Sequence, residues 1–210
     1  ACYARQLERG GDGGVVALHL SKALSSTWSA AVTASAVFTG SVRVVETDTV
    51  GMAIGAAAMA AAAVAREGGS LDECEQMARS TLDRSATWVY LHQLDILRKS
   101  GRLSTGTALS ATLLATKPIL TLHDGRFELA AKTRTQTKAF TKLVDLVASR
   151  AQGQPAFVVV QYNQDEVAAR RLEDLLRLAL PDSSFLRVEL TSVLSVHVGP
   201  GAIGVSVVFS

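Results

Sequence analysis

The sequence predicts an α/β protein with two lobes. Short apolar runs of strand length alternate with longer segments whose apolar residues recur at helical spacing. In the first half, the order strand, helix, strand, helix is typical of a parallel sheet covered by helices. Later the pattern changes to a hairpin and further helices and strands, which predicts a mixed or antiparallel sheet. We expect an N-terminal α/β lobe over residues 1–103 and a C-terminal α/β lobe over residues 104–210.

The elements of the N-terminal lobe follow from apolar runs and helix signals. The uninterrupted apolar run at residues 15–20 predicts a strand buried on both faces. Ser70 and Glu73 form a capping box, so a helix begins after the glycine pair 68–69. In chain order we expect a helix over residues 1–8, strands over 15–20 and 42–46, helices from 28, over 52–66 and from 71, and a strand over 88–91.

The elements of the C-terminal lobe rest on turn and capping signals. Asp124-Gly125 between two apolar runs predicts a tight hairpin. Asn163 and Glu166 indicate a capped helix start, and Pro181 ends that helix. In chain order we expect a helix over residues 107–115, strands over 118–122 and 126–130, a helix around 140–147, a strand over 157–161, a helix before 181, and strands over 185–190 and 203–209.

Composition excludes several classes of protein. The 210 residues include 21 Lys+Arg and 19 Asp+Glu, and this near-neutral balance argues against nucleic-acid binding. Apolar residues make up 48%, enough to exclude a disordered chain. The longest uncharged apolar run, residues 50–65, is short of the roughly 20 residues that a membrane span needs, so we expect a buried helix there. Two unpaired cysteines and four scattered histidines predict no disulfide framework and no metal site, and we expect a cytoplasmic protein.

A serine-rich segment at residues 21–28 is the first candidate site. It joins a predicted strand to a helix start, where hydroxyls, free backbone N–H groups and the helix dipole favour an anion. An ordinary serine N-cap explains part of this pattern. The hydroxyls around Ser25 exceed what one cap needs, which favours a carboxylate or phosphate site.

A second candidate is the run His197-Val198-Gly199-Pro200-Gly201. Glycines around a proline make a tight turn where backbone can approach a ligand, and His197 can donate a hydrogen bond into a cleft. A histidine simply packed beside a turn is the alternative. The glycines also spell G-x-G-x-x-G, but a dinucleotide fingerprint must open a helix, whereas the residues that follow are β-prone.

Two arginines and one catalytic pairing complete the candidates. Gly101 is expected to end a helix and redirect Arg102. An ordinary position on the surface is the alternative interpretation of Arg134. A hydrolase using Ser25 and His197 stays open, although no G-x-S-x-G elbow is present. A binding module for a phosphorylated small molecule also stays open, on the strength of the anion-friendly turn.

These segments, in their order along the chain, resemble the DegV family of fatty-acid-binding proteins. The serine-rich turn of that family, S-S-x-L-S-G-T-Y, is matched by residues 21–28, and its acidic residue and Ser after the next strand are similar to Glu46-Thr47. The L-x-x-L-x-x-G-G-R-I, K-P-I-L and H-x-G-P-G motifs are matched by residues 94–103, 117–120 and 197–201, with a D-G turn and a K-x-R between the last two. The likeness covers essentially the whole chain.

The resemblance implies a carrier protein without catalytic activity, cofactor or metal. One long-chain fatty acid would lie in an apolar tunnel between the lobes. The small alanines of the helix at 50–65 would leave room for the tail, although close helix packing explains them as well. The head-group site would comprise Ser25, Ser26, Arg102, His197 and Gly199.

The resemblance also implies a partner. A dihydroxyacetone-kinase-like fatty acid kinase would phosphorylate the head group using ATP, and Arg134 resembles a family arginine placed for docking to it.

The sequence departs from the family pattern in two ways. Ser26 and Ser100 stand where the family has glycines, and Ser26 is expected to pinch the turn or block approach to a head group. Roughly the first 70 residues of the family pattern, with its T-D-S and T-S-Q-P segments, find no counterpart, so we expect a truncated first lobe and an incomplete head-group site.

Overall fold

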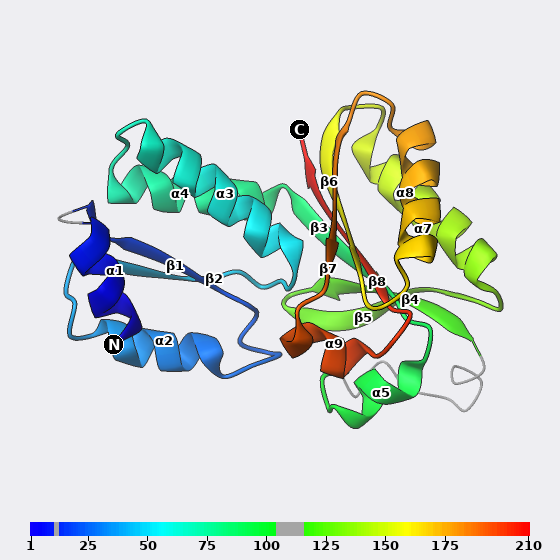
Figure 1. Cartoon of the computed structure of the whole chain (residues 1–210), viewed down its shortest axis with the longest axis horizontal. Helices are drawn as coiled ribbons and strands as arrows, with labels where there is room; N and C mark the ends of the chain where they lie inside the picture. Colours follow the sequence, from blue (N-terminus) through cyan, green and yellow to red (C-terminus); the bar gives the residue numbers. More distant parts are fainter. Residues whose placement is uncertain (11–12, 104–115) are drawn as a thin grey trace.

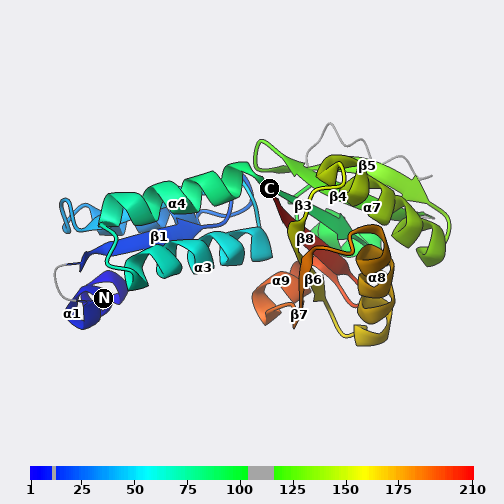
Figure 2. The ribbon, with the colours of Figure 1, turned by 90° about the horizontal axis from the view of Figure 1, so that it is seen from above.

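The computed structural model describes residues 1–10, 13–103 and 116–210, arranged as two lobes along the longest axis of the molecule (Figures 1 and 2). One lobe holds a two-stranded sheet, β1-β2, and the other a six-stranded sheet in the order β5-β4-β3-β8-β6-β7. The predicted α/β class with two lobes is therefore confirmed. Among the described helices, none is long and apolar enough to cross a membrane.

The N-terminal lobe is a parallel strand pair with helices on both sides (Figure 1). Its elements are α1 (Cys2–Gly10), β1 (Val15–His19), α2 (Thr27–Ser35), β2 (Val42–Glu46), α3 (Met52–Arg66) and α4 (Leu71–Asp83). Helices α3 and α4 pack closely because their contact is built from small side chains such as Ala57, Ala61 and Ala78. Ser70 and Glu73 form the predicted capping box. Strand β1 is half-buried along its whole length, so the expectation of burial on both faces was wrong.

The C-terminal lobe contains the mixed sheet that the sequence predicted. Its elements are β3 (Ser85–Tyr90), α5 (Leu94–Lys99), β4 (Lys117–His123), β5 (Arg126–Thr133), α7 (Gln136–Ala151), β6 (Ala156–Tyr162), α8 (Glu166–Ala179), β7 (Ser184–Glu189), α9 (Ser192–Val198) and β8 (Ile203–Phe209). Only β6 and β7 pair in parallel among the described strands of this sheet; its other pairs are antiparallel. Positive φ angles at Asp124 and Gly125 turn the chain between β4 and β5, as the Asp-Gly signal predicts.

The position of β3 corrects the expected lobe boundary. Strand β3 lies before residue 103, yet it pairs antiparallel with β4 and β8 instead of extending the parallel pair. By sheet membership the lobes divide at Arg84, not at the boundary between 1–103 and 104–210. The physical reason is that β3 is buried along nearly its whole length, which only a central strand of the larger sheet provides.

Two details of the C-terminal lobe differ from the sequence-based expectation. The side chain that caps α8 belongs to Asp165, which accepts the Ala168 N–H at 3.0 Å, whereas Asn163 serves another purpose described below. Helix α9 was not predicted, because a seven-residue segment with three valines gives a weak helical pattern. The helix expected over residues 107–115 lies outside the described residues.

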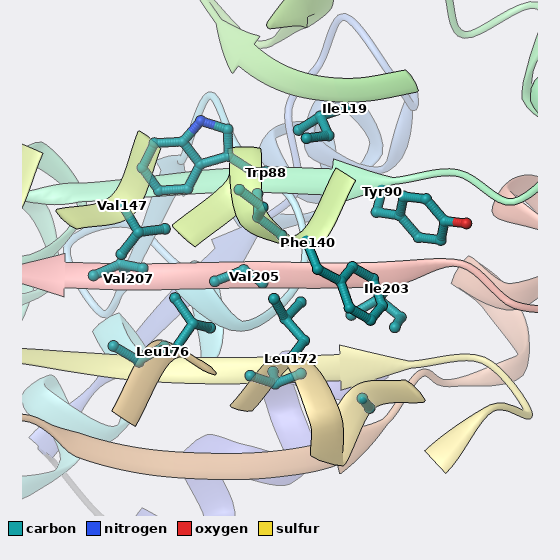
Figure 3. Close-up of a cluster of buried hydrophobic side chains, with 14 of the residues drawn as sticks. Trp88, Tyr90, Ile119, Phe140, Val147, Leu172, Leu176, Ile203, Val205 and Val207 are labelled. Atoms are coloured by element: carbon teal, nitrogen blue, oxygen red, sulfur yellow. The ribbon is translucent and has the colours of Figure 1, made fainter. Parts of the chain in front are cut away.

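One face of the six-stranded sheet is packed solid. Helices α7 and α8 cover it, and Figure 3 shows their side chains interlocking with those of the strands. Phe140, Leu172 and Leu176 from the helices have no exposed surface, and the ring of Tyr90 meets that of Phe140 edge-on at 5.5 Å. This face is the main hydrophobic core of the protein.

The opposite face of the sheet meets the N-terminal lobe through hydrogen bonds. Ser21 Oγ donates to the Gly125 carbonyl across the lobes at 2.8 Å, and the Met52 N–H at the start of α3 donates to Gln161 Oε1 of β6 at 2.9 Å. Directional bonds of this kind fix how the two lobes sit against each other. The space that they leave open is the candidate site.

Candidate functional site

An apolar cavity of about 150 Å³ lies between the two lobes. The N-terminal lobe contributes the turns after β1 and β2, and the C-terminal lobe contributes the open face of the sheet together with α5 and α9. Much of the wall is hydrocarbon, as in Leu24, Val50, Val89, Phe127, Leu190 and Leu194. A cavity of this kind suits an apolar molecule rather than a polar metabolite.

The rim of the cavity carries polar side chains from three separate segments. Ser25, Arg102 and His197 all line the cavity, together with Thr27. The structure therefore brings together three of the residues predicted from the sequence, although they are far apart in the chain. Arg102 supplies a positive charge, and no carboxylate is present among the described residues that line the cavity.

The serine-rich turn is ordered by its own hydrogen bonds. Ser21 is fully buried, and its oxygens accept the N–H groups of residues 23–25. Lys22 N–H donates to Glu46 Oε1 at 2.9 Å. The expected free N–H groups at residues 22–25 are thus already bonded, because the buried serine needs them. The groups of this turn that can bind a ligand are its hydroxyls.

Ser25 presents its hydroxyl at the cavity rim. Its Oγ lies 2.6 Å from Thr27 Oγ1 and accepts the Thr27 N–H at 3.2 Å. Among the described contacts there is no Ser25–His197 hydrogen bond, so the hydrolase pairing is not formed. The Ser25–Thr27 pair instead forms a small neutral polar patch facing the apolar space.

Ser26 lies outside the cavity. It is exposed, it caps α2 without a side-chain hydrogen bond, and its φ of −76° is ordinary for any residue. The serine therefore neither pinches the turn nor blocks the cavity, and the expectation that it does so was wrong. Its role in binding the head group stays a prediction.

Gly199 positions the histidine helix instead of lining the cavity. It ends α9 with a φ of +76°, and a Cβ there would stand 2.3 Å from Ile96 Cδ1. The positive φ favours glycine at this position, and the missing Cβ leaves the room that the Ile96 side chain occupies. Asn163 holds the same turn, since its Nδ2 donates to the Gly199 carbonyl at 2.7 Å. We therefore assign Gly199 and Asn163 to the placement of His197.

The end of α5 places Arg102 as the sequence predicts. Gly101 has a φ of +72° and terminates the helix. Ser100, the other departure from the family pattern, keeps a φ of −71° and donates from Oγ to the Leu97 carbonyl at 2.7 Å, so a serine fits there without strain. The Arg102 guanidinium is exposed and donates from Nε to the Leu24 carbonyl of the other lobe at 3.4 Å.

Arg134 and the alanines of α3 do not contribute to this cavity. Arg134 is exposed beyond the end of β5. Several alanines of α3 line a separate groove beside β1 instead, so the expectation that they leave room for a tail between the lobes was wrong. Val50 and Gly51, immediately before α3, do line the cavity.

The buried wall of the cavity was missed by sequence reasoning. Thr87, Gln161 and Gly204 line it from the three central strands, β3, β6 and β8. Gln161 is only 3% exposed. The sequence signal that could have found Gln161 is a glutamine at the end of an apolar strand segment, because a buried amide needs specific hydrogen-bond partners.

A second, polar cavity of about 350 Å³ adjoins the lobe contact near Glu46, Asp48 and Asp83. Partial burial, and then the negative charge of Glu46, raise the pKa of the Asp48 carboxyl above its usual value. No group of three His, Cys, Asp or Glu side chains placed to hold a metal occurs within residues 1–10, 13–103 and 116–210.

The chemistry of the site as a whole suits a small amphipathic acid. The lining combines apolar side chains with hydroxyls, an imidazole and a guanidinium. These groups can hydrogen-bond an anionic head group, while the interior removes a hydrocarbon tail from water.

Comparison with known proteins identifies the family. The model of the DegV family, described as uncharacterised proteins, matches residues 1–210, and the chain belongs to this family. A DegV domain-containing protein of Corynebacterium glutamicum is 60% identical over all of this chain and 77% of its own length. The crystal structure of a DegV family protein from the same species matches with a TM-score of 0.97, covering 100% of this chain and 80% of that one. A DegV family protein from Thermus thermophilus, described as binding fatty acid, matches at 30% identity with a TM-score of 0.91, covering 100% and 75% of the two chains.

Proposed function

We propose that this protein binds one long-chain fatty acid in the cavity between its lobes. The carboxylate lies at Ser25, within reach of Arg102 and His197, and the tail extends into the apolar interior. The observation that carries the proposal is that these three polar side chains line the same apolar cavity. Fatty acid binding by the Thermus thermophilus relative supports it.

The energetics favour such a ligand. Each methylene that the cavity encloses contributes about 0.8 kcal/mol before the cost of ordering the tail. A carboxylate removed from water must be hydrogen-bonded. The hydroxyls of Ser25 and Thr27 and the exposed charge of Arg102 meet this need without burying a second full charge.

The protein acts as a carrier in this proposal and performs no chemistry on the acid. The Ser25 hydroxyl engages Thr27, and His197 serves as a hydrogen-bond donor at the rim. A cytoplasmic location, the absence of a cofactor and the absence of nucleic-acid contacts belong to the same proposal.

The proposal includes a partner that receives the head group. We infer that a dihydroxyacetone-kinase-like fatty acid kinase phosphorylates the carboxylate while the tail stays bound. The exposure of Arg102 supports this idea, because the acidic end is the accessible one. Arg134 is proposed to contact the kinase.

The kinase proposal is tested with a purified kinase, ATP and the loaded protein. Arg134→Glu should lower the rate of acyl phosphate formation about tenfold, because reversing a rim charge slows association. Fatty acid affinity should not change. Lys142→Glu, the same reversal on exposed α7, is the control. Equal rates for all three proteins would remove Arg134 from the interface.

The binding proposal is tested by titrating hexadecanoic acid into the delipidated protein. Ser25→Ala should weaken binding about tenfold, since a hydrogen bond to a charged group contributes about 1.5–3 kcal/mol. Ser26→Ala, the neighbouring exposed serine, should bind like the wild type. The methyl ester, which lacks the charge, should bind weakly and equally to all three. Failure of the wild-type protein to bind the acid would overturn the proposal.

A further inference from the structure

We infer that Gln161 is the end wall of the cavity and sets the length of tail that the protein accepts. This inference rests on the proposed function, because it assigns a specificity-determining residue to the same fatty acid site. The relevant observations are the burial of Gln161, its two hydrogen bonds and the two glycines that face it.

The cavity has an exposed end and a buried end. Arg102 and Thr27 at the rim are exposed, whereas Thr87 and Gln161 are each 3% exposed. In this inference, a tail whose head group lies at the rim points toward the buried side chains, and its terminal methyl group meets the Gln161 amide.

Hydrogen bonds hold this wall in place. Gln161 Oε1 accepts the Met52 N–H at 2.9 Å, and Nε2 donates to Ser206 Oγ at 3.0 Å. Ser206 Oγ in turn lies 3.1 Å from Thr87 Oγ1. A side chain bonded at both ends of its amide cannot swing aside to admit a longer tail without breaking buried hydrogen bonds, which is costly. The wall is therefore a fixed stop.

Two glycines leave the space that the amide fills. A Cβ on Gly51, which has a φ of +76°, would stand 2.6 Å from Gln161 Oε1. A Cβ on Gly204 would stand 3.3 Å from Nε2, and that glycine has no unusual φ. Both glycines also line the cavity. The residue at 161 thus determines how far the cavity extends between them.

The inference predicts opposite shifts for two substitutions. The affinity of the wild-type protein is measured for saturated acids from dodecanoic to eicosanoic acid, which locates the length beyond which added methylenes no longer improve binding. Gln161→Ala should move this limit to longer acids and favour the next even-numbered acid about tenfold, as expected for about two more buried methylenes. Gly204→Ala should move the limit to shorter acids.

Two further variants separate length selection from a merely structural role. Gln161→Met keeps the size of the side chain but loses both hydrogen bonds, so it should lower the melting temperature and, because the side chain can now swing aside, shift the length limit less than Gln161→Ala does. Gln154→Ala makes the same change as Gln161→Ala at an exposed loop position and should alter nothing.

The outcomes distinguish this inference from the proposed function. If the wild-type protein binds no acid of the series, the proposed function fails. If it binds but Gln161→Ala and Gly204→Ala leave the length limit unchanged, the end-wall inference is wrong while the function stands. Should Gln161→Ala not fold, Gly204→Ala alone decides, because its predicted shift is toward shorter acids.

Discussion

The two faces of the six-stranded sheet are built from the same strands but differ in how completely they are packed. Toward α7 and α8, β3 presents Trp88 and Tyr90, and β8 presents Val205. Toward the N-terminal lobe, the alternate positions Thr87 and Gly204 line a cavity. Because side chains alternate along a strand, adjacent residues serve a solid core and an open space.

This difference teaches where a small-molecule site can form in such a fold. Close packing contributes most to stability, so the face under α7 and α8 can be filled completely (Figure 3). The other face is joined to the N-terminal lobe by a smaller apolar cluster, which includes Val50 and Val89, and by buried polar contacts of Gln161 and Ser21. These contacts fix the lobes without filling the space, which leaves room for a tail.

The largest expected difference between the two faces is in the free energy of unfolding that is lost when a leucine is replaced by alanine. Leu172→Ala on the packed face removes a fully buried side chain and should lower the free energy of unfolding by about 4 kcal/mol. Leu24→Ala at the cavity should cost only about 1 kcal/mol, because its side chain is half-buried and already borders empty space. Urea denaturation measures both values. Equal losses would mean that the cavity face is packed as tightly as the core.

Filling the cavity should abolish binding while sparing the fold. Leu24→Trp places a large ring in the apolar space and should weaken hexadecanoic acid binding by at least about thirtyfold. Val37→Trp, at a position that is 80% exposed near the end of α2, is the matched control and should bind normally. Isothermal titration and thermal unfolding report binding and folding separately. Normal affinity in Leu24→Trp would place the acid elsewhere.

The polar cavity beside the contact between the lobes extends the comparison to a third region. There the charge of the lining side chains matters more than the volume of the cavity. The raised pKa of Asp48 means that the carboxyl holds its proton more tightly in the folded state than in the unfolded state. Once the pH has risen through that pKa, the charged carboxylate therefore lowers the free energy of unfolding. Asp48→Asn should stabilise the protein at about pH 7 by less than about 1 kcal/mol, since solvent screens the site, and should have no such effect at about pH 3. Asparagine also tolerates the φ of +49° at this position. Thermal unfolding at the two pH values provides the measurement, and destabilisation at neutral pH would contradict the assignment.

Sequence reasoning predicted local structure better than pairing. The hairpin at Asp124 and the capping box at Ser70 follow from short-range chemistry, and both are confirmed. The partner strands of β3 could not be predicted, because a buried apolar run fits a parallel or an antiparallel neighbour equally well. Residues that act through distant contacts, such as Asn163 and Gln161, were missed because their partners lie 36 and 109 residues away.

The candidate site was predictable only where a motif carried it. Ser25, Arg102 and His197 stand in recognisable turns, and the structure brings them to one cavity. Gly199 stands in the same motif as His197, yet its role is to let α9 approach α5. A motif contains residues that shape a turn as well as residues that contact a ligand, and residue spacing alone does not separate the two kinds.

The central claim is that a fatty acid lies between the lobes with its carboxylate at Ser25 and its tail end at Gln161. A crystal structure of the complex with hexadecanoic acid tests it most directly. We predict one continuous tube of electron density running from Ser25 Oγ, between Val89 and Leu194, to the Gln161 amide. Density in the groove between α3 and β1, or an empty cavity in a protein that binds the acid in solution, would contradict the claim.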